Sequence, residues 1–260
     1  MSRRFIQAGW ASWNGAIAFY TCLPLPPKWP VEFRWVARWL PLVGLSIGML
    51  LGLVDWALAQ VGMPALIASV LVILGGVWIT GGLHLDGVID TADGSAVPVW
   101  GESALSRRLA AMSDSRIGAF GGMAAIALLM IKTSALASLT DNRGLALVAM
   151  AVWGRWAQQW AIACYPYLKA EGKGAFHKVA LPSVWYVLPG LLGIVVISLG
   201  ISALGWASWQ WGWQSIAAGI VLSMLTGAYF NQKLGGHTGD TYGAVVEWTE
   251  AFLLCALTVG

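Results

Sequence analysis

The segment GGLHLDGVIDTADG (residues 81–94) follows an apolar run and carries three aspartates, Asp86, Asp90 and Asp93. On an α-helix, where each residue turns the chain by about 100°, Asp90 lies about 40° to one side of Asp86 and Asp93 about 20° to the other. A helix over this segment therefore places the three carboxylates on one stripe, at the end of the hydrophobic stretch 63–80.

The carboxylates of this stripe repel one another unless a cation lies between them. Side chains four residues apart on a helix have Cβ atoms about 5–6 Å apart, and at an effective dielectric of about 20 each such pair is repelled by roughly 3 kcal/mol. A divalent metal ion converts the same charges into a binding site. A solvated acidic loop is the alternative. We predict that Asp86, Asp90 and Asp93 are metal ligands.

The composition indicates an integral membrane protein. Of the 260 residues, 58% are hydrophobic and only 10% are charged, whereas a soluble domain carries about 25% charged residues. The mean hydropathy is +0.70. We predict an all-α polytopic membrane bundle of about six to seven transmembrane helices that forms one domain over residues 1–260. The net charge of +3 gives no indication of nucleic-acid binding.

Apolar stretches long enough to cross a bilayer recur along most of the chain. The expected spans are residues 39–59, 63–83, 117–139, 145–165, 184–205, 214–230 and 244–259. The last is the least regular, because Glu247 and Glu250 lie within it. Before the first span, we expect an N-terminal interfacial or re-entrant helix from about Phe5 to Tyr20, ended by the prolines that follow.

The positive charges are distributed unequally between the two sets of connections. Arg143 alone lies in one set, and Lys132 and Arg155 fall within spans. The other set holds twelve basic residues: Arg3, Arg4, Lys28, Arg34, Arg38, Arg107, Arg108, Arg116, Lys169, Lys173, Lys178 and Lys233. Because basic loops stay in the cytoplasm, the N-terminus and residues 84–116, 166–183 and 231–243 are predicted to be cytoplasmic, and every motif lies on that face.

Two further motifs on this face carry charges suited to a phosphate site. In SDSRIGAFGG (113–122), Asp114 could cap the next helix or join the aspartate stripe, and Arg116 offers a planar donor for phosphate. In PYLKAEGKGAFHK (166–178), Lys169 and Lys173 flank glycines, a pattern typical of a phosphate-binding loop or of a basic loop beside anionic lipid. Arg155, within a span, is expected to face a polar interior.

The last motif, KLGGHTGDTYGAVVEWTE (233–250), surrounds Asp240 with glycines and leads two carboxylates into an apolar helix. A glycine-rich turn explains the glycines but not these carboxylates. His84 and His237 each lie next to an aspartate motif. Each histidine is expected to be either a hydrogen-bonded structural residue or a metal or phosphate contact.

Together these stretches resemble the cobalamin synthase family, adenosylcobinamide-GDP ribazoletransferase. GGLHLDGVIDTADG is similar to the hallmark of that family, DSRIGAFG and GGHTGDTYGA follow in the family's order, and FYTCLPLP (19–26) resembles its N-terminal segment. The resemblance covers most of the chain. Cys22 and Lys169 stand where the family commonly has arginine, and Lys169 retains the charge.

The resemblance implies a multi-pass enzyme of the bacterial inner membrane that requires Mg²⁺ and faces the cytoplasm. Its substrates would be adenosylcobinamide-GDP and α-ribazole or α-ribazole 5′-phosphate, and its products adenosylcobalamin, or its 5′-phosphate, and GMP. A homo-oligomer is compatible with the sequence. The residue roles that we predict on this basis leave the choice of base open. These roles are metal ligands Asp86, Asp90, Asp93 and Asp114; bases Asp114 or Asp240; and substrate or phosphate contacts His84, Arg116, Arg155, Lys169, Lys173 and His237.

Two other functions share some of these features. A CDP-alcohol phosphotransferase also uses aspartate-rich motifs at the end of a membrane helix, although its DG…AR signature is not matched here. A divalent-cation transporter would use the acids within spans as an ion path. Most acids of this chain instead gather at one face, which favours the transferase.

Overall fold

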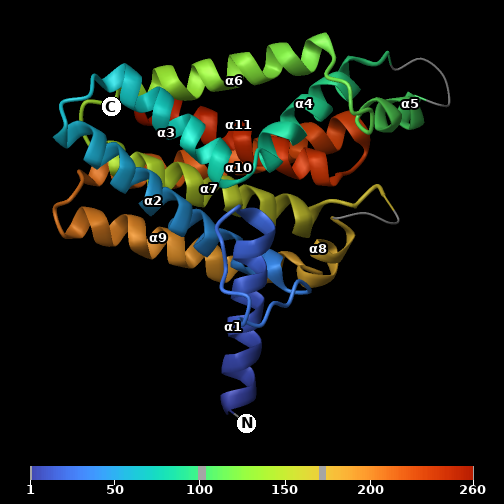
Figure 1. Ribbon diagram of the computed structural model, residues 1–260, viewed down its shortest axis with the longest axis horizontal. Coiled ribbons are helices and arrows are strands. Elements are labelled where there is room, and N and C mark those ends of the chain that lie inside the picture. The colour runs from blue at the N-terminus through green and yellow to red at the C-terminus, as the bar shows by residue number, and fades with distance from the viewer. Residues whose placement is uncertain (1, 99–103, 170–173, 260) are drawn as a thin grey trace.

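The computed structural model describes residues 2–98, 104–169 and 174–259, and within them the chain is almost entirely helical (Figure 1). Seven of its helices run roughly side by side: α2 (Leu40–Gln60), α3 (Ala65–Ile79), α6 (Ala119–Ser138), α7 (Arg143–Cys164), α9 (Leu188–Ala203), α10 (Trp209–Leu234) and α11 (Gly239–Leu257). The remaining elements are α1 (Ser2–Tyr20), η1 (Val36–Trp39), α4 (Leu83–Ala96), α5 (Ala104–Ala111), α8 (Ala175–Ala180) and η2 (Val184–Tyr186). The predicted all-α fold is confirmed.

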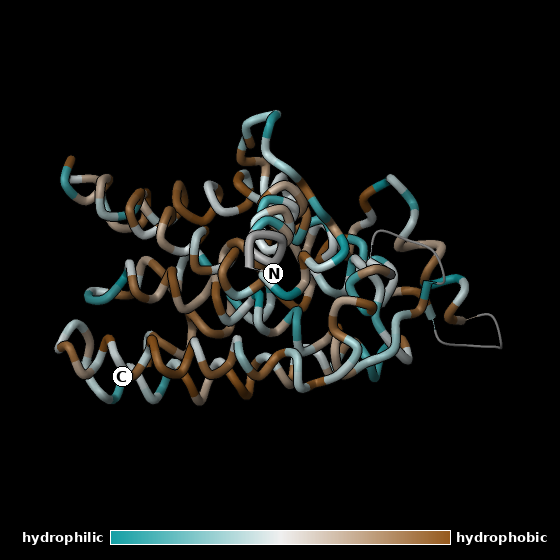
Figure 2. Tube along the Cα trace, turned by 90° about the horizontal axis from the view of Figure 1, so that it is seen from below, coloured by the Kyte–Doolittle hydropathy of each residue, from teal (hydrophilic) through white to brown (hydrophobic). Residues whose placement is uncertain are grey.

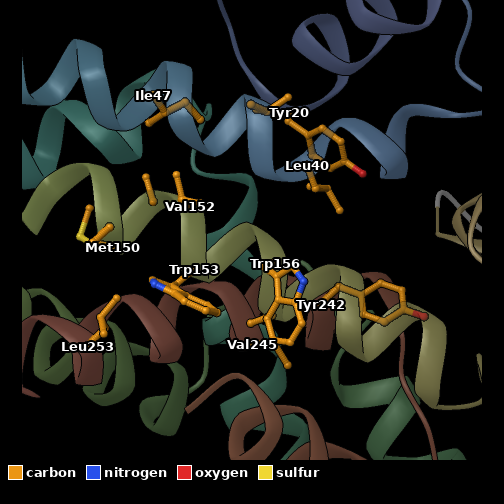
Figure 3. Close-up of a cluster of buried hydrophobic side chains, with 14 of the residues drawn as sticks. Tyr20, Leu40, Ile47, Met150, Val152, Trp153, Trp156, Tyr242, Val245 and Leu253 are labelled. Atoms are coloured by element: carbon orange, nitrogen blue, oxygen red, sulfur yellow. The ribbon is translucent and has the colours of Figure 1, made fainter. Parts of the chain in front are cut away.

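Helix α7 forms the centre of the bundle, and nearly all of its side chains from Ala146 onward are buried. It packs against α2 on one side and against α10 and α11 on the other. In Figure 3, Val152 lies on the α2 side of α7, near Ile47, whereas Trp153 lies on the α11 side. Trp153 is fully buried, so the core is built around an aromatic-rich central helix.

The contact between α2 and α7 depends on glycines spaced four residues apart. Gly44, Gly48 and Gly52 form one ridge of α2, and a Cβ added at Gly48 would lie 2.6 Å from the Cα of Val148. At Gly44 an added Cβ would overlap the carbonyl of Ala151. Small residues at this spacing let two helix backbones approach closely, as in the GxxxG packing of membrane helices. The segment GLSIGMLLG therefore fixes how α2 sits on α7.

Four helical segments are long and apolar enough to cross a membrane: Val36–Gln60, Ala119–Ser138, Val184–Ala203 and Trp209–Leu234. The pair α3 and α4 qualifies as a fifth only when taken together, and the two helices meet at 89°. Helices α7 and α11 lie where the fourth and seventh spans are expected, but they carry polar residues that the bundle buries. The predicted six to seven spans thus correspond to seven bundle helices, of which four are apolar enough on their own and α3 only together with α4.

Helix α1 runs across the axis of the bundle, and its first turns project away from it (Figure 1). Figure 2, which views the molecule along α1, shows hydrophobic residues along the bundle helices and more hydrophilic ones toward the connections. The end of α1 is anchored, because His177 of α8 hydrogen-bonds the hydroxyl of Tyr20 at 2.6 Å and Asn14 donates to the carbonyl of Pro30 at 2.9 Å. This transverse position fits the interfacial helix that was predicted.

Candidate active site

Helix α4 carries the aspartate stripe and is set at an angle to the bundle by two glycines. After α3 the backbone passes through Gly81 and Gly82 with φ of 61° and 71°, a left-handed conformation that glycine adopts without strain. The chain then begins α4 at 89° to α3. Because α4 has three carboxylates in fourteen residues and turns this sharply, we place it outside the membrane-spanning segments, at their end.

The first turn of α11 is pressed against the middle of α4. Gly87 is buried on α4, and a Cβ there would overlap the carbonyl oxygen of Asp240. Farther along, a Cβ at Gly243 would lie 3.0 Å from the Cα of His84. These two close approaches bring Asp240 to the helix that carries Asp90. Carboxylates that are more than one hundred residues apart in sequence therefore share one site.

Asp90 is the electrostatic centre of this site. Its half-buried position, followed by the negative charges of Asp86, Asp240 and Asp93, raises the pKa of Asp90 from 3.8 to about 7, and Lys169 lowers it only in part. Asp86 is exposed and stands one turn before Asp90 on the same helix face. The site consequently holds more negative charge than its lysine compensates, which favours the binding of a cation.

Asp93 has a second role that the sequence did not reveal. Its two carboxylate oxygens accept hydrogen bonds from the backbone N–H groups of Gly118 at 2.7 Å and Gly121 at 2.8 Å, at the start of α6. Side chains at these glycines would overlap the carboxylate. Asp93 thus caps α6 from another helix, and the glycines of SDSRIGAFGG make room for it. Each oxygen keeps a further lone pair, so its predicted role as a metal ligand stays a prediction.

Asp114 and Arg116 form an exposed pair next to α6. Arg116 donates through Nη2 to Asp114 at 2.7 Å, and hydrogen bonds from the Arg116 side chain and backbone lower the pKa of Asp114 to about 2. Neither side chain is packed into the α4–α11 contact. Asp114 is therefore an anion paired with its own neighbour, and its predicted roles as ligand or base have no support from its position here.

Two motifs distant in sequence meet beside Asp240. Tyr167 and His237 form a parallel backbone bridge, in which the N–H of Leu168 donates to the carbonyl of His237 at 2.8 Å. The bridge places Lys169 next to the aspartate, with Nζ 3.4 Å from Asp240 Oδ2. The predicted phosphate contact Lys169 thus lies in the site. Lys173, predicted for the same role, lies outside the described residues.

His237 makes structural contacts in this arrangement, and its position gives no support to the predicted substrate contact. Its ring is buried between Tyr165 and Tyr242, with Nδ1 3.1 Å from Thr241 Oγ1 and Nε2 3.1 Å from the carbonyl of Gly227. Burial lowers the pKa of His237 to about 4, so the ring is neutral. Both nitrogens are engaged, and the histidine instead holds the start of α11 in place.

Arg155 is likewise placed away from any surface that a phosphate could reach. It is 2% exposed and donates through Nη1 to Glu250 Oε1 at 2.6 Å. Lys132 of α6 completes the network, with Nζ 2.8 Å from Glu247 and 2.6 Å from Glu250. Two cations and two carboxylates neutralise one another inside the bundle. The polar interior expected around Arg155 is present, but the arginine is used there for helix packing.

His84 also faces the interior and not the acidic site. It is 1% exposed, and neither ring nitrogen has a hydrogen-bond partner among the described residues. Burial, followed by the charges of Arg155 and Lys132, lowers the pKa of His84 well below its ordinary value. A neutral, buried ring supplies no positive charge to a phosphate. The structure therefore does not place His84 as the predicted substrate contact.

Sequence reasoning missed one residue of the site and one pairing behind it. Tyr167 lies close enough to Asp240 for that charge to help raise the tyrosine pKa, after burial, and its ring stacks on Tyr242 at 6.0 Å. The pairing is the ion pair between Lys132 and Glu247. Both are ionisable residues within apolar segments of the sequence. Such residues need partners in a membrane, and this signal could have suggested the pair.

The donor type of the site fits a divalent metal ion. Asp86, Asp90 and Asp240 offer carboxylate oxygens, the ligands that Mg²⁺ prefers, and burial together with the neighbouring carboxylates raises the pKa of Asp90. In the ranges that the structure describes, no three His, Cys, Asp or Glu side chains are close enough together to enclose an ion as they stand. The metal ligands accordingly stay a prediction.

This fold and this site define the class of the protein. It is a multi-pass helical membrane protein with a carboxylate-rich site at one end of its bundle, where α4 turns away from α3 at 89°. Sequence comparison gives the family. The chain belongs to the cobalamin-5-phosphate synthase family, whose sequence model matches residues 12–258.

Relatives confirm this membership over nearly the whole chain. A protein of Trichormus variabilis named adenosylcobinamide-GDP ribazoletransferase is 52% identical over 254 residues, which cover 94% of this chain and 95% of the relative. Proteins with the same name from Synechococcus elongatus and Synechocystis sp. are 49% and 45% identical, and the alignments cover 98% and 99% of this chain and 99% and 98% of the relatives. No solved structure matches the chain significantly.

Proposed function

We propose that this protein joins α-ribazole, or its 5′-phosphate, to adenosylcobinamide-GDP and releases GMP, in a reaction that depends on Mg²⁺. The family and the names of the relatives support the substrates. The observation that carries the proposal is the acidic site itself. Asp240 at the start of α11 lies against α4, which carries Asp86 and Asp90, and Lys169 stands beside Asp240.

The reaction is a substitution at phosphorus. A ribose hydroxyl oxygen forms a bond to the phosphorus that is attached to cobinamide, the bond from that phosphorus to the bridging oxygen breaks, and GMP leaves with the electron pair. The hydroxyl proton passes to a base. Such a transfer requires positioning and neutralisation of charge more than covalent participation by the protein. A site with several carboxylates and one lysine suits these requirements.

The chain's own residues divide these tasks. Asp86 and Asp90 would hold Mg²⁺, which supplies charge neutralisation at the diphosphate when bound. Lys169, half-exposed beside Asp240, would contact a phosphate oxygen. Asp240 would take the hydroxyl proton or complete the metal site from α11, and the sequence alternative Asp114 is less well placed because Arg116 pairs with it. Asp93 keeps α6 fixed against α4.

The site is proposed to face the cytoplasm of a bacterial cell, across the inner membrane. Support comes from the charge distribution, because twelve of the thirteen basic residues in the connections, all except Arg143, belong to the set that includes the site. The substrates are large, charged and nucleotide-like, so a site at a membrane surface suits them better than one within the bilayer.

The packing of the intramembrane acids argues against the alternative of cation transport. Glu247 and Glu250 are paired with Lys132, and Asp55 accepts from Arg143 at 2.6 Å. Each carboxylate is thus neutralised by a helix-bound cation in a closely packed interior. An ion path requires carboxylates that can exchange partners with a moving ion.

The test is a direct assay of the purified protein with adenosylcobinamide-GDP, α-ribazole 5′-phosphate and Mg²⁺, measured by GMP release. We expect GMP only when both substrates and the metal are present, and none after chelation with EDTA. Asp90→Asn should lose activity, whereas Asp141→Asn, an exposed acid outside the site, should retain it. Turnover without metal, or full activity in Asp90→Asn, would refute the proposed site.

A further inference from the structure

A long apolar groove lies between α2, α7 and α9, on the opposite side of α7 from the aspartate site. Its volume is about 290 Å³. Its walls include Pro41 and Leu45 of α2, Val148 and Val152 of α7, and Ile197 of α9. Among the described residues that line it, Arg38 alone is charged, and it stands at one end, just before α2 begins. The groove is therefore apolar, with a cationic residue at one end, which we call its mouth.

The groove exists because α9 packs mainly on α10 and has glycines at two of the positions that border the groove. Gly190 and Gly193 both line the groove. A Cβ added at Gly190 would lie 3.0 Å from Pro41 Cγ, whereas one added at Gly193 would meet no atom within 4 Å. Helix α9 therefore touches α2 at Gly190 and borders empty space at Gly193. The described residues around the groove thus leave an apolar surface uncovered within the part of the chain that crosses the membrane.

The dimensions of the groove match one leaflet of a bilayer. Its lining on α9 runs from Pro189 to Ile201, and twelve residues of α-helix rise about 18 Å. Half of a typical hydrocarbon core is about 15 Å thick. A single acyl chain that enters from the Arg38 end would therefore follow the groove over its whole length.

Aromatic rings hold Arg38 at the mouth. Its guanidinium lies 4.4 Å from the ring centre of Trp35 and 4.7 Å from that of Tyr186, and Nε donates to the carbonyl of Ala180 at 3.0 Å. The residue is nevertheless exposed. A guanidinium fixed in this way keeps its planar fork oriented, which suits recognition of a phosphate group. Trp and Tyr at this depth are typical of the headgroup level.

We propose that this groove binds an anionic phospholipid, with one acyl chain along α2 and α9 and the lipid phosphate paired with Arg38. Charge complementarity at the mouth and the apolar lining behind it both require such an amphiphile. The site is independent of the aspartate site and of the reaction proposed for it. The lipid would complete the packing between α2 and α9, which the protein leaves open.

The headgroup contact is tested with Arg38→Gln, and Arg34→Gln serves as its control. Arg34 is also exposed and also lies over Trp35, at 4.6 Å, but does not line the groove. The full-length protein, purified in detergent, is titrated with phosphatidylglycerol or with phosphatidylcholine of the same chains, and bound lipid is counted by native mass spectrometry. We expect Arg38→Gln to lower the affinity for phosphatidylglycerol roughly tenfold, and Arg34→Gln to leave it unchanged.

The acyl-chain contact is tested by filling the groove. Gly193→Phe places a ring in the open space, and Gly200→Phe is its matched control, because Gly200 lies on the same helix, also has no atom within 4 Å of an added Cβ and does not line the groove. We expect Gly193→Phe to lose tightly bound lipid of both kinds, and Gly200→Phe to retain it. Equal thermal stability in the two variants would show that both fold.

Three outcomes would overturn the proposal. Unchanged lipid binding in Gly193→Phe would show that no chain occupies the groove. An undiminished preference for phosphatidylglycerol in Arg38→Gln would show that the guanidinium does not contact the headgroup. A shift from dimer to monomer in Gly193→Phe, measured by light scattering, would show that a second copy of the chain covers the groove.

Discussion

Replacement of Asp90 by asparagine should make the metal-free protein more stable at pH 8. In the folded chain the pKa of Asp90 is raised to about 7 by burial and by Asp86, Asp240 and Asp93, whereas its ordinary value is 3.8. Ionised Asp90 therefore works against folding whenever no cation is bound. Asparagine has nearly the same shape and no charge, so the variant keeps the packing and removes the repulsion.

The sign and size of this effect follow from linkage. Between about pH 4 and pH 7 the folded state keeps a proton that the unfolded state has released, so the free energy of unfolding falls as pH rises, and the loss is complete above about pH 7. A pKa difference this large corresponds to roughly 4 kcal/mol for a fully buried group. Solvent screening at half-buried Asp90 reduces it to about 1–2 kcal/mol, or roughly 3–6 °C in melting temperature.

The assay is thermal unfolding of purified wild type and Asp90→Asn in detergent, at pH 5 and pH 8, with and without Mg²⁺. Without metal, the variant should melt higher than wild type at pH 8, and by a much smaller margin at pH 5, where only about a third of the loss has developed, once buffer effects are matched with Asp141→Asn. Mg²⁺ should stabilise wild type at pH 8 and have much less effect on Asp90→Asn. A variant that is less stable at pH 8, or an equal response of both proteins to Mg²⁺, would refute the electrostatic reasoning.

Three further predictions concern the packing around the site. Lys132→Met should lower the free energy of unfolding by about 3–5 kcal/mol, because it leaves buried carboxylates uncompensated. Adding Glu247→Gln should recover part of that loss in a double-mutant cycle measured by chemical unfolding, and additive losses would contradict a coupled network. Gly48→Ala should destabilise the protein by about 1–3 kcal/mol, because its Cβ would meet the α7 backbone. Gly75→Ala, whose added Cβ has its nearest neighbour 3.9 Å away, should not, and equal melting temperatures of the two variants would exclude the close approach. Asp93→Ala should cost roughly 2 kcal/mol by removing both hydrogen bonds to the start of α6, seen as faster hydrogen exchange of the first turn of that helix; unchanged exchange there would contradict the capping role.

The sequence alone determined the membrane character and the helical fold, and it predicted where the candidate site lies. Hydropathy is a local property, so apolar stretches show the bundle helices without knowledge of their partners. The spacing of Asp86 and Asp90 is equally local, because helix geometry puts residues four apart on one face. The family resemblance rests on contiguous motifs of the same kind, and the comparisons confirm it.

Only the tertiary structure decided which charged residue serves which purpose. Asp93 and Asp90 belong to one stripe in sequence, yet Asp93 binds the backbone of α6 while the charge of Asp240 acts on Asp90. Arg155 and Lys169 are both basic residues near motifs, yet one is neutralised by Glu250 inside the bundle and the other reaches the site. The physical reason is that an ionic partner can lie anywhere in the chain. Partners 71 and 118 residues apart meet because of how the helices pack, and side-chain spacing along one helix does not encode that packing.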